Sequence, residues 1–348
     1  MKYRNNLHIE NFDYEIDPKH IAQQPIEPRD HARLLIYERS TQKIAHRHVY
    51  DIVEYLNGDD VLVLNDTRVV HARLLGKKMT GGKVELLVLN ELGEKIWRCL
   101  VKGSGIRSGT IIEFDSFDLQ CEVVSRDESG SCSVQFSGSV ETVIDEIGTI
   151  PLPPYIKKPL IDTERYQTVY SVENGSVAAP TAGLHFTREL LAAIADIGVK
   201  VVTVTLHVGL GTFAPVRVQQ IDSHAIHTEW CRMDGDVMNT INSARKSDGR
   251  VIAIGTTTVR VLETASDKSM SGHVNSFDGY TDLFIYPGYT FNVVDSLLTN
   301  FHVPKSTLLM MVGAFMKERG IETLLDIYAD AIQKGYRFYS FGDAMLVI

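Results

Sequence analysis

One segment of the 348-residue chain, GSVAAPTAGLHFT at residues 175–187, combines residue types that suit a ligand loop. Its two glycines and its proline favour unusual backbone dihedrals, and its small side chains let the backbone approach a ligand closely. His185 adds a group that titrates near neutral pH. A tight structural turn packed under a sheet would use the same residues, so both interpretations stay open. The candidate site residues here are Thr181, Gly183, His185 and Phe186.

Two further segments place glycine and hydroxyl residues directly after an apolar strand pattern, LHVGLGTFAPV at 206–216 and AIGTTTVRVLE at 253–263. Open α/β sheets bind ligands at the carboxyl ends of their strands, and free amides at a helix start suit a polar or anionic ligand. Each segment alone is also compatible with an ordinary strand-to-helix turn. In the 206–216 segment, GLGTF lacks the third glycine of the GxGxxG fingerprint, so a dinucleotide site is only weakly indicated there. The candidate residues are His207, Gly209, Gly211, Thr212, Phe213, Thr256, Thr257 and Arg260.

The segment HAIHTE places His224, His227 and Glu229 close together. A metal site would need a helix that puts both histidines on one face, together with a further ligand. The order HxxHxE also differs from the HExxH of zinc proteases. General acid–base chemistry, substrate binding or structural hydrogen bonding is therefore favoured over metal binding.

The segment LLTNFHVPKSTLLMM at 297–311 puts Asn300 and His302 between an apolar run and a helix that Ser306 or Thr307 would cap. Polar side chains at such a junction are costly to bury without partners. They therefore indicate either a lined site or a hydrogen-bonded junction.

Charged candidates follow two other apolar runs. The C-terminal segment at 336–348 is aromatic and apolar and must pack, so Asp343 within it would be a buried carboxylate that needs a partner. The segment LNDTRVVHARL at 64–74 ends a strand, and Arg68 or Arg73 could pair with a carboxylate or a phosphate.

The elements that must position these residues alternate between strand and helix patterns, which indicates an α/β unit with a mainly parallel sheet. Strands are expected at 32–40, 59–66, 199–208, 250–256, 283–288 and 336–348. Helices are expected at 49–56, 187–198, 235–248, 256–266, 306–316 and 322–335.

The pattern changes between about 70 and 150, where short β-rich runs are broken by glycine, serine and aspartate about every ten residues. Such spacing is typical of a small antiparallel barrel or sandwich. The proline-rich PLPPYIKKP then ends this region. We therefore expect a discontinuous α/β domain, residues 1–70 and 152–348, with an inserted small antiparallel β-barrel domain at 71–151.

The composition, with 44% hydrophobic and 23% charged residues, is that of an ordinary soluble globular protein. No apolar run approaches the roughly 18 residues of a membrane span, and no secretory signal is visible. The four cysteines form no CxxC pair, which suggests neither a disulfide framework nor a thiolate zinc site. A cytoplasmic location without membrane contact is the resulting expectation.

A net charge of −9 argues against non-specific coating of nucleic acid. Short basic pieces at 46–48, 77–78 and 157–158 leave room for a local basic patch. For each piece taken singly, an ordinary solvated surface is favoured.

Ten motifs in this order resemble the queuosine-biosynthesis family of S-adenosylmethionine:tRNA ribosyltransferase-isomerases. The resemblance spans Phe12 to the C-terminus and is weakest between about 76 and 150. The matching motifs are IAQQPIEPRDHARLL, LNDTRVVHARL, PLPPYI, PTAGLHFT, LHVGLGTF, HAIHTE, GTTTVRVLE, FIYPGY, LLTNFHVPKSTLLM and YRFYSFGDAML.

The resemblance implies a monomeric enzyme that moves the ribosyl part of S-adenosylmethionine to the aminomethyl group of a 7-deazaguanine base in tRNA. Adenine and methionine leave, and the product is epoxyqueuosine at the wobble position. S-adenosylmethionine is then a co-substrate, and no cofactor is implied. The family fold, an α/β domain with an inserted barrel, agrees with the pattern of elements.

This chemistry needs a base for a 5′ hydrogen beside the sulfonium, a base for the aminomethyl group and an acid for adenine. Individual roles are not assigned by the sequence. The pool is His185, His207, His224, His227, Glu229, His302 and Asp343.

Substrate binding is expected from the glycine and threonine loops, from Arg68, Arg260 and Asn300, and from an aromatic face on the sulfonium, supplied by Phe186, Phe213 or Tyr289. Lys77, Lys78, Lys157 and Lys158 are candidates for holding the anticodon arm. The family pattern would have Arg at position 214, where this chain has Ala214.

Two rival classes stay open. A metal-dependent hydrolase would use His224, His227 and Glu229, and would contain stoichiometric zinc. A tRNA-binding module without catalysis would bind an anticodon stem–loop but release no adenine from S-adenosylmethionine.

Overall fold

The computed structural model describes residues 7–114, 119–127, 130–209, 216, 218–316 and 320–348. The chain divides into two compact units. One consists of Met1–Arg68 and Pro153–Ile348, and the other of Val69–Leu152. Within the described residues, no helix is long and apolar enough to span a membrane.

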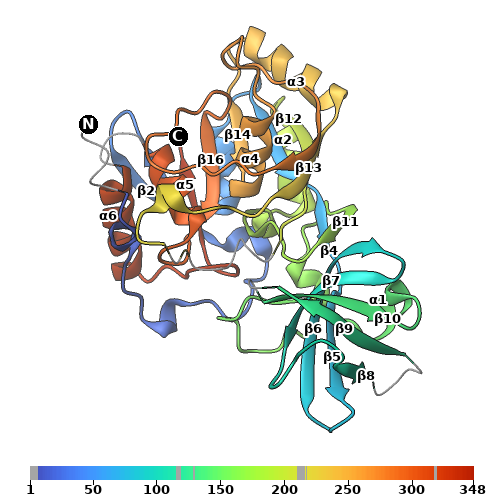
Figure 1. Cartoon of the computed structure of the whole chain (residues 1–348). Coiled ribbons are helices and arrows are strands. Elements are labelled where there is room, and N and C mark those ends of the chain that lie inside the picture. The colour runs from blue at the N-terminus through green and yellow to red at the C-terminus, as the bar shows by residue number, and fades with distance from the viewer. Residues whose placement is uncertain (1–6, 115–118, 128–129, 210–215, 217, 317–319) are drawn as a thin grey trace. The chain divides into compact units, whose positions relative to one another are not determined.

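Nine strands of the larger unit form one sheet in the order β15-β13-β12-β3-β14-β16-β17-β1-β2 (Figure 1). Parallel pairing joins β12, β3, β14 and β16, so the carboxyl ends of these four strands lie at one edge of the sheet. The expected α/β class with a mostly parallel sheet is confirmed. The strands are β1 Arg33–Glu38, β2 Lys43–His48, β3 Val61–Asn65, β12 Lys200–Leu206, β13 Glu229–Met233, β14 Val251–Ile254, β15 Phe277–Thr281, β16 Ser296–Asn300 and β17 Ala344–Val347.

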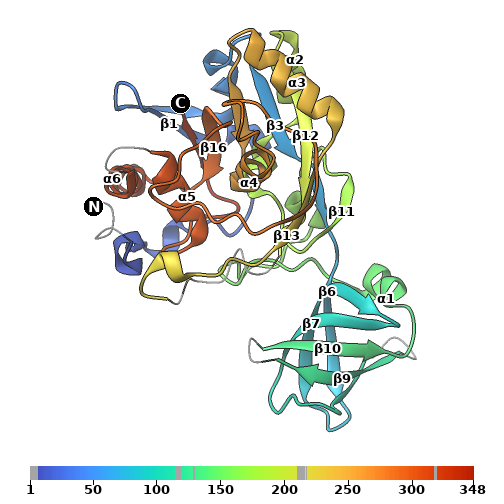
Figure 2. The same ribbon diagram turned by 45° about the horizontal axis from the view of Figure 1, so that its top comes forward.

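The central strands are apolar on both faces because both faces are covered. Alternate residues of β3 enter two different hydrophobic clusters, Val61 and Val63 in one and Leu62 and Leu64 in the other. The first cluster includes residues of α3, α4, α5 and α6, and the second includes residues of α2. Figure 2 shows α4 end-on, in front of the strands. The helices are α2 Arg188–Asp196, α3 Gly235–Lys246, α4 Thr256–Thr264, α5 Thr307–Phe315 and α6 Gly320–Gln333.

Hydroxyl caps begin two of these helices, as their sequences predict. The Thr187 hydroxyl accepts a hydrogen bond from the Leu190 N–H at 3.0 Å at the start of α2. Ser306 caps α5 by accepting from the Leu309 N–H at 3.2 Å.

The helix expected at 49–56 is present as a 3₁₀ helix, Val49–Tyr55, with Val49 and Ile52 buried. One expected strand is wrong. The apolar run at 283–288 lies outside the strands, and β15 precedes it. The carbonyl oxygen of Leu283 accepts instead from the Arg260 side chain, at 3.1 Å.

The smaller unit contains a closed barrel of six antiparallel strands in the order β10-β7-β6-β5-β8-β9, which confirms the expected barrel. Cys99, Cys121 and Cys132 are buried free thiols within it, and burial raises the pKa of each. Its elements are β5 Arg73–Lys78, β6 Lys83–Gly93, β7 Ile96–Lys102, β8 Ile111–Glu113, β9 Gln120–Arg126, β10 Ser131–Phe136 and α1 Val140–Ile147. A separate two-stranded sheet pairs β4 (Thr67–Val69) with β11 (Glu173–Ser176).

The side chain of Asn65, the last residue of β3, links three elements at the carboxyl edge of the sheet. Its Nδ2 donates to the Leu206 carbonyl oxygen and to Thr257 Oγ1, both at 3.1 Å. Its Oδ1 accepts from the Leu206 N–H at 3.1 Å and the Thr67 N–H at 3.2 Å. Asn65 thereby satisfies polar groups where the β-ladder ends.

We expect Asn65→Ala to lower the free energy of unfolding by about 2–4 kcal/mol, because it leaves buried backbone groups unpaired. Urea denaturation measures this as a lower midpoint with an unchanged slope. Asn239→Ala, on the exposed surface of α3, is the matched control and should change stability little. Equal effects of the two substitutions would contradict the linking role of Asn65.

Candidate active site

A cavity lies where the central parallel strands end. Its lining comes from the 175–187 segment, from Val208 after β12, from the start of α4 and from the end of β16, so the sequence segments do converge. It is a narrow cavity of about 30 Å³, or about 370 Å³ when all the empty space out to its open mouth is counted. The lining residues are Ala179, Pro180, Thr181, Ala182, Val208, Gly255, Thr256, Thr257, Thr299, Asn300, His302 and Leu308.

Asn300 organises one wall of this cavity. Its Nδ2 donates to His185 Nε2 at 3.2 Å and to the Tyr339 carbonyl oxygen at 3.1 Å. Its Oδ1 accepts from the Thr181 hydroxyl at 3.1 Å. His185 is only 4% exposed. Burial, with Arg337 and Arg29 nearby, lowers the pKa of His185 to about 3.

The ring, the backbone N–H and the backbone carbonyl oxygen of His302 each form a hydrogen bond. Its Nε2 is 2.7 Å from Thr299 Oγ1, its N–H donates to the Tyr328 hydroxyl at 2.9 Å, and its carbonyl oxygen accepts from the Tyr14 hydroxyl at 2.5 Å. Burial lowers the pKa of His302 to about 3. Both buried imidazoles are therefore neutral at physiological pH and are weak proton acceptors.

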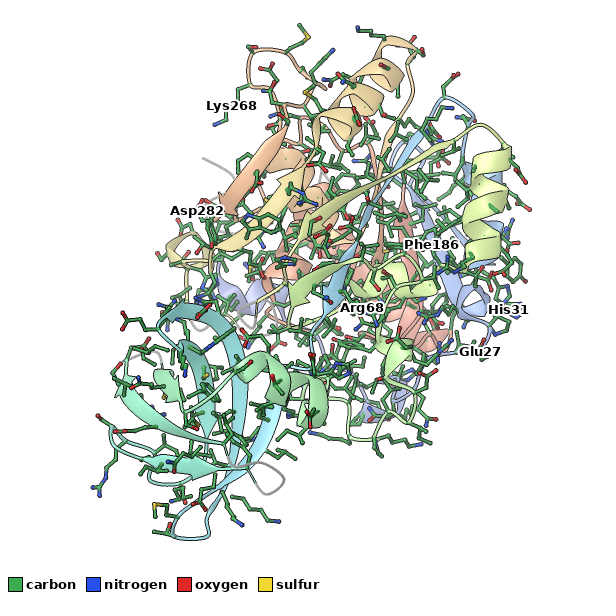
Figure 3. The ribbon with its side chains drawn as sticks, turned by 90° about the vertical axis from the view of Figure 1, so that its right-hand side faces the viewer. Glu27, His31, Arg68, Phe186, Lys268 and Asp282 are labelled. Carbon is green, nitrogen blue, oxygen red and sulfur yellow. The ribbon has the colours of Figure 1, made fainter. Side chains whose placement is uncertain are left out.

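The 175–187 segment is both a packed turn and a cavity wall. A side chain at Gly183 would overlap the Tyr170 hydroxyl, since an added Cβ would lie 2.0 Å from that oxygen. Phe186 (labelled in Figure 3) is 0% exposed and packs with Leu190 and Ile194 of α2. This burial corrects the expectation that its ring faces the ligand.

His207 follows β12 at the same edge and is half-buried. Its Nδ1 is 2.8 Å from Thr67 Oγ1, and its ring stacks on Trp230 with centroids 4.9 Å apart. Burial lowers the pKa of His207, while Glu173 raises it and Arg232 lowers it further.

Glu229 and Arg260 form a buried ion pair between β13 and α4, with side chains 5% and 6% exposed. Glu229 also accepts from the Gly209 N–H at 2.7 Å. Arg260 donates further to the carbonyl oxygens of Leu283 and Thr281. The pair fixes two strands against α4, which makes it a structural element beside the cavity.

The segment before β13 does not support the metal interpretation. Residues 224–228 are not helical, so His224 and His227 do not share a helix face. His224 packs edge-on against Phe284, burial lowers its pKa, and His227 is exposed. Among the described residues, no group of three or more His, Cys, Asp or Glu side chains could hold a metal ion.

Two other candidates have partners away from the cavity. Arg68 (Figure 3) pairs with Glu164 at 2.5 Å. Asp343 accepts from the N–H groups of Arg33 at 3.0 Å and Arg337 at 2.8 Å, so its carboxylate joins backbone segments.

Tyr289 requires a correction. It lines a different cavity together with Arg250 and Ser296, at the starts of β14 and β16, and hence lies at the opposite edge of the sheet. Its hydroxyl donates to Glu263 at 3.1 Å. The candidates Gly211, Thr212 and Phe213, and the departure at Ala214, lie outside the described residues.

The sequence analysis missed Thr67, Thr299 and Trp230, whose contacts hold the site histidines. A usable signal exists for the two threonines, because each lies at the polar end of an apolar strand, Thr299 next to Asn300 and Thr67 two residues after Asn65. No local signal marks Trp230, since its stacking partner His207 is on a different strand segment.

The two buried histidines predict a pH-dependent stability. Their pKa values are about 3 in the folded protein and about 6.5 when unfolded, so between these values the unfolded chain binds more protons. The free energy of unfolding should fall by about 2 kcal/mol per histidine from pH 6.5 to 4.5. Urea denaturation across this range tests it. His185→Gln or His302→Gln should flatten the profile and exposed His227→Gln should not; three identical profiles would contradict the assignment.

The buried ion pair predicts an asymmetric response. Glu229→Gln should cost about 3–5 kcal/mol of stability because it leaves the Arg260 charge buried and unpaired. The double variant Glu229→Gln/Arg260→Met should recover part of the loss. Asp234→Asn, which removes the exposed partner of Arg232, should cost less than about 1 kcal/mol. Thermal and urea unfolding measure these values, and additive losses in the double variant would refute the coupling.

Comparisons with known proteins agree with this architecture. Residues 9–347 match the family model described as queuosine biosynthesis protein. A protein of Acetivibrio thermocellus, named S-adenosylmethionine:tRNA ribosyltransferase-isomerase, is 49% identical over 345 residues, covering 98% of this chain and 100% of that protein. A Desulforamulus reducens protein of the same name is 47% identical over 346 residues, with coverage of 98% and 100%.

A solved structure extends the agreement to the fold. The crystal structure of S-adenosylmethionine tRNA ribosyltransferase from Thermotoga maritima is 37% identical, with a TM-score of 0.56, and the match covers 97% of this chain and 100% of that one. With a family model over nearly its whole length and relatives near half identity, the chain belongs to the queuosine biosynthesis protein family, as an enzyme of the ribosyltransferase-isomerase type.

Proposed function

We propose that this protein transfers and isomerises the ribosyl part of S-adenosylmethionine onto 7-aminomethyl-7-deazaguanine at the wobble position of tRNA. The products are epoxyqueuosine in tRNA, adenine and methionine. S-adenosylmethionine is consumed as a co-substrate, and the reaction requires no further cofactor. Membership of the family supports the reaction type, and the cavity at the carboxyl edge of the sheet supports a small polar substrate.

The electrostatics of the cavity carry the proposal for a sulfonium substrate. No charged side chain is among the described residues that line it. Burial keeps His302 in the lining and His185 behind Asn300 neutral, as their lowered pKa values indicate. The positive charge of Arg260 is matched by Glu229. A cationic sulfonium therefore meets hydroxyl, amide and carbonyl dipoles rather than an unpaired cation.

The second substrate, a base in the anticodon loop, arrives from single-stranded RNA. Such a base can be splayed out of its stack into a protein pocket. Lys157 and Lys158 are exposed residues of the α/β unit and stay candidates for phosphate contacts. Lys77 and Lys78 belong to β5 of the barrel, where the Lys78 ammonium donates to the Ser104 carbonyl oxygen at 2.8 Å.

The proposal predicts adenine release that depends on both substrates. The protein is incubated with S-adenosylmethionine and an anticodon stem–loop that carries the aminomethyl base, and adenine is quantified by chromatography. We expect one adenine per modified stem–loop, with the new base identified by mass spectrometry.

Two substrate controls sharpen this experiment. A stem–loop with guanine at the same position lacks the nucleophile, and S-adenosylhomocysteine lacks the sulfonium, so neither should support product formation. Folded protein that binds the stem–loop without releasing adenine would be a binding module. Adenine release without a change in the RNA would indicate a hydrolase.

A further inference from the structure

The hydrogen bonds of Thr67 favour one tautomer of His207. The Thr67 hydroxyl donates to the Glu173 carbonyl oxygen at 3.5 Å. Its oxygen is then the acceptor for His207 Nδ1, 2.8 Å away. A neutral imidazole carries one N–H, so the proton lies on Nδ1 and the lone pair lies on Nε2.

The space around Nε2 is kept open by a glycine. Gly175 is exposed and has a φ of +147°, in the region that favours glycine. A Cβ added there would lie 2.6 Å from His207 Nε2 and would cover it. Within the described part of the chain, Nε2 has no hydrogen-bond partner. The lone pair is thus oriented by Thr67 and left accessible beside Gly175.

The other two histidines of the site are more deeply buried, and their Nε2 atoms are bonded. Nε2 of His185 accepts from Asn300, and Nε2 of His302 bonds to Thr299. Both rings are buried, whereas His207 is half-buried and can exchange protons with solvent. His207 is therefore the histidine of this edge whose geometry suits proton transfer.

We propose that His207 is the proton acceptor for the incoming aminomethyl group and that Thr67 is its positioning residue. The inference rests on the proposed function. An N–H bond of the substrate ammonium breaks, its electron pair stays on the amine nitrogen, and the proton forms an N–H bond with Nε2. The neutral amine then forms a C–N bond with the ribosyl carbon as the bond from that carbon to adenine breaks and adenine leaves with its electron pair. The proton lost by the new ammonium neutralises the adenine, and the imidazolium returns its own proton to solvent.

The charges around the ring agree with this role. Burial and Arg232 lower the pKa of His207, so the imidazole is neutral and can accept a proton at physiological pH. Glu173, on β11, favours the imidazolium once it forms. Arg232, on β13, is paired with Glu173 and Asp234, and Asp66 lies near both Glu173 and Arg232. The Trp230 ring stacks on the His207 ring.

The first test measures the tautomer without any substrate. Nitrogen-15 NMR of protein labelled in the imidazole rings should show a protonated Nδ1 for His207, with the signal assigned by its loss in His207→Gln. Thr67→Val should shift this signal toward a mixture of tautomers, and Thr67→Ser should restore it. An unprotonated Nδ1 in the unchanged protein would overturn the inference, whatever the enzyme assay shows.

The second test measures turnover. We expect Thr67→Val to lower kcat about tenfold, the order of one lost hydrogen bond, with little change in KM. Thr67→Ser should recover most of kcat, and His207→Gln should lose at least about 100-fold. Thr240→Val, the same change on helix α3, is the control and should leave kcat unchanged.

The pH profile separates catalysis from folding. In the unchanged protein kcat should rise as the imidazole loses its proton, with the midpoint of the rise below pH 6.5, since the pKa of His207 is lowered. His207→Gln should lose this rise. Turnover by His207→Gln with an intact profile would overturn the assignment, whereas absence of turnover in the unchanged protein would refute the proposed function alone.

Discussion

The site depends on how polar groups are satisfied where four parallel strands end. Strand pairing stops at this edge, yet the backbone groups beyond it remain buried and need partners. The Asn65 side chain supplies them by joining β3 to the end of β12 and to Thr257 at the start of α4. This amide replaces the ladder bonds that are missing beyond the strand ends, next to the cavity lined by Thr257.

The electrostatic character of the edge follows from burial. Desolvation favours the neutral form of an imidazole, so the packing of His185 and His302 removes two positive charges from the cavity. The charge of Arg260 is matched by the carboxylate of Glu229. His207 differs because it is half-buried and its Nε2 has no partner within the described chain, whereas the Nε2 atoms of His185 and His302 are bonded; His207 can therefore exchange a proton.

Much of the fold could be predicted because periodicity and turn chemistry are local. The β-rich spacing indicated the barrel, and alternating strands and helices indicated the parallel sheet. Thr187 and Ser306 begin helices because a cap bonds within its own turn. The strand expected at 283–288 is wrong because this run is apolar for contact with the core. Its Leu283 carbonyl oxygen accepts a hydrogen bond from the Arg260 side chain of α4 instead of from a neighbouring strand.

The sequence by itself determined the elements, the family and the segments that meet at the site, since these reside in residue types and their order along the chain. Only the tertiary structure decided which candidates share an edge. It separated Tyr289 from the cavity, buried Phe186 in the core and matched Arg260 with Glu229. The role of a side chain depends on partners that are distant in sequence, as with Thr67 and His207, 140 positions apart. Hydrogen bonds and burial therefore set the protonation of such a side chain, and no local sequence pattern predicts them.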